Sequence, residues 1–231
     1  MYSARAICKN REIMKQKYLT ESLRYLNDID KTAFDNMISI GSGSGEYEKN
    51  SIEELNCEIT CIDPNPLIYS KQIILSPKYK YLENYLIANP NKKITTLLII
   101  WPYPDGEHSF DEIDCIKKSS ADNIIIIYEA YGGAGTDKLH YFLSKINAPS
   151  SIVMLEGNEN IKYDIDIDNY YFDRCYYTTY DYIYDDEEYL EHCTECTLVT
   201  DINFHEIFRK KVPIFYSFNV QCLVICILRK K

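Results

Sequence analysis

Three glycines at alternate positions, Gly41, Gly43 and Gly45, follow a short apolar run and carry the clearest chemical signal in the sequence. A residue without a side chain lets a ligand lie directly against the backbone, and it permits the tight turn that joins a strand to a helix. An acidic residue, Asp63, ends the next apolar run, 63 − 45 = 18 residues after the last glycine. A carboxylate at that position accepts hydrogen bonds from ribose hydroxyls. The spacing therefore predicts a site for a nucleoside-containing cofactor.

Two strands and a helix have to hold these residues in place. Apolar runs over residues 37–41 and 58–63 predict the strands, and residues 46–55 between them predict the helix. Prolines then end the second strand, because proline has no N–H to donate to a sheet. After the prolines we expect a helix over residues 67–77 and a short third strand over residues 78–82.

The alternation of strands and helices continues as far as residue 147. Continuous apolar runs over residues 95–100 and 123–129 are typical of buried parallel strands, and residues 109–118 and 136–147 predict the helices that follow them. This alternation predicts the α/β class with a doubly wound sheet. The apolar stretch over residues 215–228 predicts one further strand.

Glu46 distinguishes two cofactor classes that share a glycine loop. A dinucleotide-binding loop, G-x-G-x-x-G, has glycine or alanine at this position so that the helix packs closely against the strand. The G-x-G-x-G spacing here resembles motif I of the class I S-adenosylmethionine-dependent methyltransferases. The resemblance covers residues 35–147. It implies one domain of residues 1–231, built on a doubly wound, mostly parallel seven-stranded sheet with helices on both faces and closed by residues 215–228 as an antiparallel strand.

The resemblance also implies which residues bind S-adenosylmethionine. The glycine loop lies beneath the methionine half of the cofactor, where side chains would collide. Asp63 binds the ribose hydroxyls, and Glu83 or Asn84, at the end of the third strand, binds the adenine amine. The cofactor-binding residues expected on this basis are Gly41, Ser42, Gly43, Gly45, Asp63, Glu83, Asn84 and Trp101.

Two departures from the family pattern keep other functions open. Family members carry an acidic residue two positions before the first glycine, where this chain has Ser39, so the usual partner of the cofactor's ammonium group is missing or comes from elsewhere. The loop after the fourth strand reads Trp101-Pro102-Tyr103-Pro104-Asp105, without the leading Asn or Asp of amino-methylating members. The alternative is therefore a catalytically inactive methyltransferase-fold scaffold or regulatory subunit that binds a protein partner. A nucleotide- or NAD-dependent enzyme is a third option, which Glu46 disfavours.

The candidate catalytic residues follow from the chemistry of methyl transfer. The reaction is an in-line displacement, so alignment and exclusion of water provide most of the acceleration. A base is needed only when the acceptor has to lose a proton, as a hydroxyl does. Asp105, His108 and Glu129 are the candidate bases, and Glu129 is the best placed, at the end of its strand. Tyr103 and Trp101 either stack on a planar substrate or belong to the core. We expect a nucleic-acid base or a small planar molecule as the acceptor, with RNA favoured.

Two flanking segments lie outside this pattern. Residues 1–34 predict a helical extension, with apolar spacing over residues 10–30, and this helix either packs on the domain or folds over the cofactor. Residues from about 160 to 200 are acidic and rich in tyrosine, and we expect them to form a solvated insertion.

A Cys-x-x-Cys segment, Cys193 to Cys196, follows His192 and raises the question of zinc. Zinc needs four ligands in tetrahedral arrangement. The residues available to complete such a site are Cys175, His205, Cys222 and Cys226. No second Cys-x-x-Cys or His-x₃₋₅-His motif accompanies the first one, so we expect no metal site.

Composition narrows the class of protein and its surroundings. A formal net charge of −10 argues against broad non-specific nucleic-acid binding, although basic residues concentrated in 5–17, 209–211 and 229–231 allow a local basic groove. The nine cysteines are odd in number and follow no secretory signal, which favours reduced thiols in the cytoplasm. No apolar run approaches the ~20 residues that span a bilayer. Abundant Ile, Asn, Lys and Tyr (22 Tyr) favour an AT-rich genome, such as that of a large DNA virus or a protist.

Overall fold

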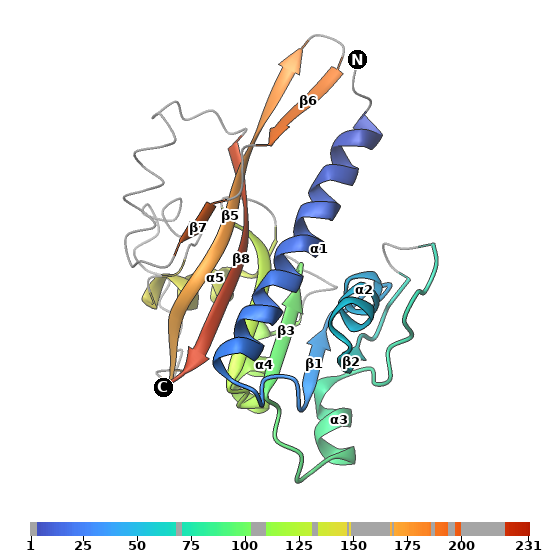
Figure 1. Cartoon of the computed structure of the whole chain (residues 1–231), viewed down its shortest axis with the longest axis vertical. Coiled ribbons are helices and arrows are strands. Elements are labelled where there is room, and N and C mark those ends of the chain that lie inside the picture. The colour runs from blue at the N-terminus through green and yellow to red at the C-terminus, as the bar shows by residue number, and fades with distance from the viewer. Residues whose placement is uncertain are drawn as a thin grey trace.

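The computed structural model describes residues 4–67, 71–102, 110–130, 134–146, 148, 167, 169–185, 188–193, 197–199 and 220–231. Over these residues the chain forms five helices and eight strands (Figure 1). The helices are α1 (Ala4–Ile29), α2 (Glu46–Leu55), α3 (Leu82–Ala88), α4 (Glu112–Ser119) and α5 (Asp137–Lys145).

The strands form one sheet in the described part of the chain, in the order β2-β1-β3-β4-β8-β5-β6, with β7 paired to β5. Their bounds are β1 (Met37–Ile40), β2 (Ile59–Ile62), β3 (Thr96–Ile100), β4 (Asn123–Ala130), β5 (Tyr170–Asp185), β6 (Glu188–Cys193), β7 (Thr197–Val199) and β8 (Val220–Lys230).

The sheet has a parallel half and an antiparallel half. Strands β2, β1, β3 and β4 are mutually parallel, whereas β8 runs antiparallel to both β4 and β5, and β6 and β7 run antiparallel to β5. The predicted α/β class is confirmed, and so is the antiparallel strand over the described residues 220–228. The prediction of seven mostly parallel strands is wrong, because the eight described strands make a mixed sheet.

The tyrosine-rich segment accounts for this difference. We expected a solvated insertion over residues 160–200, but Tyr170–Asp185 forms the long strand β5, which pairs with β8 from Tyr170 to Asp181. The segment is rich in Tyr, Phe and Thr, which favour a pleated strand, and its acidic residues did not outweigh that preference. Beyond Asp181, the described partner of β5 is β6, and this hairpin extends past β1 and β3 beside the first turns of α1 (Figure 1).

Helices cover both faces of the sheet, as predicted. On one face, α1 and α2 pack on buried side chains of the central strands, and the fully buried apolar residues of α1 there are Leu19, Leu23 and Leu26. On the other face, α3, α4 and α5 pack on the alternate residues of the same strands. Because α1 lies across the sheet (Figure 1), it is a packing helix, which is one of its two expected roles. No helix in the described residues has both the length and the apolar composition that crossing a bilayer requires.

The segment after β2 differs from the prediction. Residues 71–77 contain bends and no helix, and the expected third strand is reduced to a single bridge between Tyr79 and Ile62. The N–H groups of Ile74 and Leu75 donate to the carbonyl of Ser44 at 2.8 and 3.0 Å. The segment is therefore held by the glycine loop, and bonds to that loop replace the bonds of a helix.

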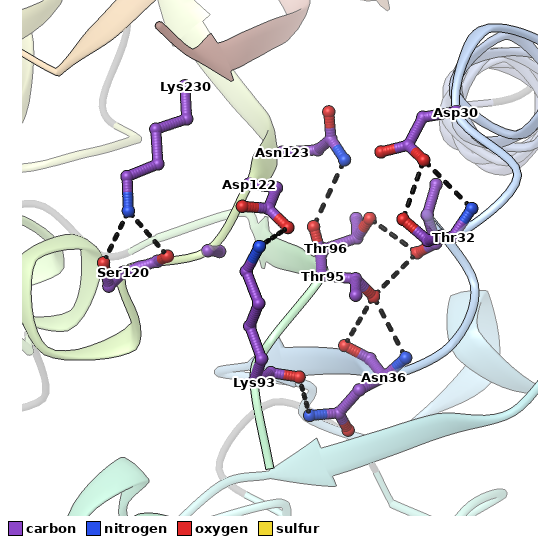
Figure 2. A network of polar contacts seen from close by, with 12 residues as sticks. Asp30, Thr32, Asn36, Lys93, Thr95, Thr96, Ser120, Asp122, Asn123 and Lys230 are labelled. Atoms are coloured by element: carbon purple, nitrogen blue, oxygen red, sulfur yellow. Dashed lines mark hydrogen bonds and ion pairs between the residues drawn. The ribbon is translucent and has the colours of Figure 1, made fainter. Parts of the chain in front are cut away.

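A polar network fixes the edge of the sheet at which the parallel strands begin (Figure 2). The Asn36 N–H donates to Thr95 Oγ1 at 3.0 Å, and the Asn123 side chain donates to the Thr95 carbonyl at 3.2 Å. Lys93 pairs with Asp122 at 2.6 Å. These groups satisfy one another at the starts of β1, β3 and β4, so the opposite, carboxyl edge is the one left for a ligand.

Candidate cofactor-binding site

The glycine loop lies at the carboxyl edge of the sheet, between β1 and α2. Its three glycines have left-handed backbone conformations, with φ of 69° at Gly41, 53° at Gly43 and 74° at Gly45. The Gly41 N–H donates to the Ile62 carbonyl of β2 at 2.9 Å, and the Gly45 N–H donates to the Ser42 carbonyl at 2.9 Å. Non-glycine residues are disfavoured at such φ values, so the alternating glycines follow from the turn itself.

Space distinguishes the three glycines from one another. A Cβ on Gly41 would lie 3.0 Å from the ring of Phe110, and a Cβ on Gly45 would lie 2.5 Å from the backbone oxygen of Leu75. A Cβ on Gly43 would meet no atom within 4 Å in the described part of the chain. The chain itself therefore packs on Gly41 and Gly45, whereas Gly43 presents bare backbone to open space. It is the point at which a ligand can approach the loop.

Asp63 braces the same loop. Its Oδ2 accepts the Gly43 N–H at 2.8 Å, and its Oδ1 accepts the Asn65 N–H at 2.6 Å. The side chain is half-buried, and each carboxylate oxygen keeps a further lone pair. The structure thus places the predicted ribose-binding residue beside the open glycine. It adds a role that the sequence pattern did not indicate, because Asp63 also holds the conformation of the loop.

Glu48 is a site residue that sequence reasoning missed. It belongs to the first turn of α2, its side chain is fully buried, and its Oε1 accepts the Ser39 hydroxyl at 2.6 Å. Burial, with a smaller contribution from the nearby carboxylate of Asp63, raises the pKa of Glu48 to about 7. The signal in the sequence is that Glu48 stands three residues after Gly45, where a side chain at a helix start turns back toward the preceding loop.

Glu83 and Asn84 follow a single bridge residue, Tyr79, and not the full third strand that we expected. Both lie in the first turn of α3. Glu83 pairs with Lys118 in the last turn of α4 at 2.5 Å, and Asn84 Oδ1 accepts the Tyr81 N–H at 3.2 Å. Because α4 follows β3 and runs back across the sheet, Lys118 lies toward the edge where the strands begin. The contact of Glu83 or Asn84 with the adenine amine stays a prediction.

Trp101 follows β3 at the carboxyl edge, with a φ of 56°. The Lys15 ammonium group of α1 lies 3.6 Å from the centroid of its ring, a distance at which a cation is attracted to the aromatic face. The ring is half-buried and packs against both core clusters. These contacts favour the core role for Trp101 over stacking on a substrate.

The predicted catalytic residues are largely outside the part that the structure describes. Asp105, Tyr103 and His108 lie outside the described residues. The backbone of Glu129 lies in β4, opposite Leu223 of β8 and close to the carboxyl end of the strand, as predicted, but its side chain is not among those described. The catalytic roles therefore stay predictions.

A buried carboxylate, Glu112, ties together the two loops at this edge. Its Oε2 accepts the Thr136 hydroxyl at 2.6 Å, so the start of α4 is joined to the start of α5. Next to it, the Gly135 N–H donates to the Pro102 carbonyl at 2.8 Å. Burial raises the pKa of Glu112 to about 7. These two hydrogen bonds fix the ends of the segments that follow β3 and β4, where reacting groups are expected.

The candidate zinc ligands lie only partly within the described residues. No group of three or more metal-ligating side chains occurs among the residues described. Cys175 and Cys226 are buried free thiols on facing positions of β5 and β8, whereas the side chains of His192, Cys193 and Cys196 are not described.

Comparison with known proteins adds no relative to this description. No family model matches the chain, and neither a curated protein nor a solved structure matches it. A functional assignment therefore depends on the geometry and charge of the site.

Proposed function

We propose that the protein binds S-adenosylmethionine against the Gly41–Gly45 loop and transfers its methyl group to an acceptor. The observation that carries the proposal is the open backbone at Gly43, bordered by the carboxylate of Asp63 at 2.8 Å and underlain by the carboxylate of Glu48. S-adenosylmethionine carries a positively charged sulfonium and an ammonium group, which acidic surroundings favour.

The same charges disfavour a dinucleotide. The pyrophosphate of such a cofactor needs the free N–H groups and the positive dipole at a helix N-terminus. Here the first turn of α2 carries Glu46 and Glu48, and the Gly43 N–H already donates to Asp63. The antiparallel β8 also supports the proposal, because it lies where the family resemblance implies a closing strand.

In this proposal the residues of the chain bind and orient the cofactor and the acceptor and keep water away from them, and the bound cofactor supplies the methyl group. In the transfer, a lone pair of the acceptor forms the new bond to the methyl carbon while the carbon–sulfur bond breaks, and its electron pair stays on sulfur. We propose a nucleic-acid base, RNA before DNA, as the acceptor, because a ring nitrogen needs no base for this step. The free thiols described, such as Cys61 and Cys115, suit the reducing cytoplasm expected from the composition.

The alternative is a scaffold that has the fold without the activity. The observation that favours it is the packing of Phe110 and Leu75 on two of the three glycines. In that case the protein would use its surface to bind a partner.

Calorimetric titration separates these functions. We expect S-adenosylmethionine and S-adenosylhomocysteine to bind with micromolar dissociation constants, and NAD not to bind. Transfer of labelled methyl groups to RNA, DNA and protein fractions then identifies the acceptor. Binding without transfer to any fraction supports the scaffold, and a folded protein that binds neither methionine-derived ligand overturns the proposed cofactor.

A further inference from the structure

The carboxylate of Glu48 lies under the glycine loop with one oxygen unsatisfied. Oε1 accepts the Ser39 hydroxyl, but Oε2 has no hydrogen-bond partner among the described residues, and the side chain has no exposed surface. An ionised carboxylate that is buried without a full set of partners is costly. This position therefore needs either a proton on Glu48 or a positive charge nearby.

The neighbouring strands do not supply that charge. On β1 the neighbour of Glu48 is the neutral hydroxyl of Ser39. On β2 it is Cys61, whose thiol stays protonated because burial raises its pKa to about 12. Asp63, after β2, adds a further negative charge.

Among the described side chains of the adjacent helices, Arg24, Lys15 and Lys49 have partners other than Glu48. On α1, Arg24 pairs with Glu54 at 2.6 Å, and the Lys15 ammonium lies on the ring of Trp101. On α2 itself, Lys49 pairs with Glu53 at 2.7 Å on the exposed side of the helix. Within the described residues, no cation is among the groups that shift the pKa of Glu48.

We propose that Glu48 is the counter-charge for the positively charged cofactor, that it is protonated in the ligand-free protein, and that it releases its proton to solvent when S-adenosylmethionine docks over Gly43. This inference rests on the proposed function. Ser39 stands where the family has its acidic residue, and its hydroxyl holds an acid that α2 supplies instead. Because burial holds the pKa of Glu48 at about 7, cofactor binding becomes tighter as the pH rises through that value.

Calorimetry in pairs of buffers with different ionisation enthalpies measures the protons released on binding. The proteins are the wild type, Glu48→Gln and the matched control Glu46→Gln, which removes an exposed charge two residues before Glu48 in the first turn of the same helix. The ligands are S-adenosylmethionine and the neutral 5′-deoxy-5′-methylthioadenosine. The cofactor's own amine titrates equally in all three proteins, so the difference between them isolates Glu48.

We expect the wild type and Glu46→Gln to bind S-adenosylmethionine roughly tenfold more tightly at about pH 8 than at about pH 6, since only about a tenth of Glu48 is ionised at the lower pH. Proton release at about pH 6 should be absent in Glu48→Gln, and its affinity should lose the pH dependence. Affinity for the neutral ligand should be the same in all three proteins. If Glu48→Gln binds S-adenosylmethionine with the proton release of the wild type, the inference is overturned and the proposed function stands. If the folded wild type binds neither S-adenosylmethionine nor S-adenosylhomocysteine, the proposed function fails and the inference fails with it.

Discussion

Gly43 and Gly45 are neighbours in one loop, but they have different reasons to be glycine. Both have positive φ, and only Gly45 is also in close contact with another segment, at the backbone of Leu75. The difference can be measured, because Gly45 is constrained by the packing of Leu75, whereas Gly43 is constrained by the ligand that we propose.

Alanine at each position separates binding from stability. Gly43→Ala should cost about 1–2 kcal/mol of stability, because of its left-handed φ, and should weaken S-adenosylmethionine binding more than tenfold, because the methyl group projects into the ligand's space. Gly45→Ala should cost more stability, since its Cβ would lie 2.5 Å from the Leu75 oxygen. Urea unfolding and calorimetry measure the two effects. Wild-type affinity in Gly43→Ala would remove the glycine loop from the proposed site.

Glu48 should make the stability of the protein depend on pH. Its pKa is about 7 in the folded chain, against an ordinary value of 4.5 for a glutamate carboxyl. The folded state therefore holds this proton more tightly than the unfolded state, and the folded state loses stability as the pH rises from 4.5 through 7. Replacing the carboxyl by an amide removes this loss.

The difference in unfolding free energy between Glu48→Gln and the wild type should therefore grow in favour of the variant by roughly 2–3 kcal/mol between about pH 5 and about pH 8. Urea unfolding at the two pH values gives the number. Any constant effect of the amide cancels in this comparison, and a difference that does not change with pH would contradict the buried, protonated state of Glu48.

At the level of elements, α1 holds one face of the sheet through a row of leucines. Leu23 has no exposed surface, whereas Ile87 of α3 is 79% exposed. Leu23→Ala should lower the free energy of unfolding by about 2–5 kcal/mol, as expected for a large buried side chain, and Ile87→Ala should change it by less than about 0.5 kcal/mol. Equal effects in urea unfolding would show that α1 does not pack on the sheet as described.

Elements with a strong local signal could be predicted from the sequence, and those defined by distant partners could not. The β1–loop–α2–β2 unit follows from apolar runs and glycine spacing, and its bounds match within two residues. The segment over residues 71–77 is ordered by bonds to Ser44, and β5 is ordered by pairing with β8, so no local pattern identifies either one. Glu48 was missed for a related reason, since a charged residue on a helix is expected to face solvent.

At the level of the whole molecule, the strands of the sheet differ in how many neighbouring strands and covering helices they contact. Strands β4 and β8 are paired on both sides and covered on both faces, whereas among the described strands β6 lies at the edge of the sheet and pairs only with the far end of β5. Strands of this kind open locally at a lower cost in free energy than the centre of a sheet.

Native-state hydrogen exchange should therefore separate the two regions. Backbone amides of residues 124–128 and 223–228 should exchange only through global unfolding, and those of residues 188–193 should exchange faster through local opening. Mass spectrometry of peptic peptides resolves these segments. Equal protection of the β6 and β8 amides from exchange would contradict the position of β6 at the edge of the sheet.

The place of β8 between β4 and β5 also governs how the chain can assemble while it is being made. In the sheet β8 joins the two strands, but in the chain it follows both, with 219 − 130 = 89 residues between the end of β4 and its own start. At a ribosomal rate of about 5–20 residues per second, β4 waits roughly 5–18 seconds with an open edge of N–H and C=O groups. During that interval the open edge of β4 can pair with the same edge of a neighbouring nascent chain. Chains made on one mRNA that carries several ribosomes are therefore the ones most exposed to misassembly.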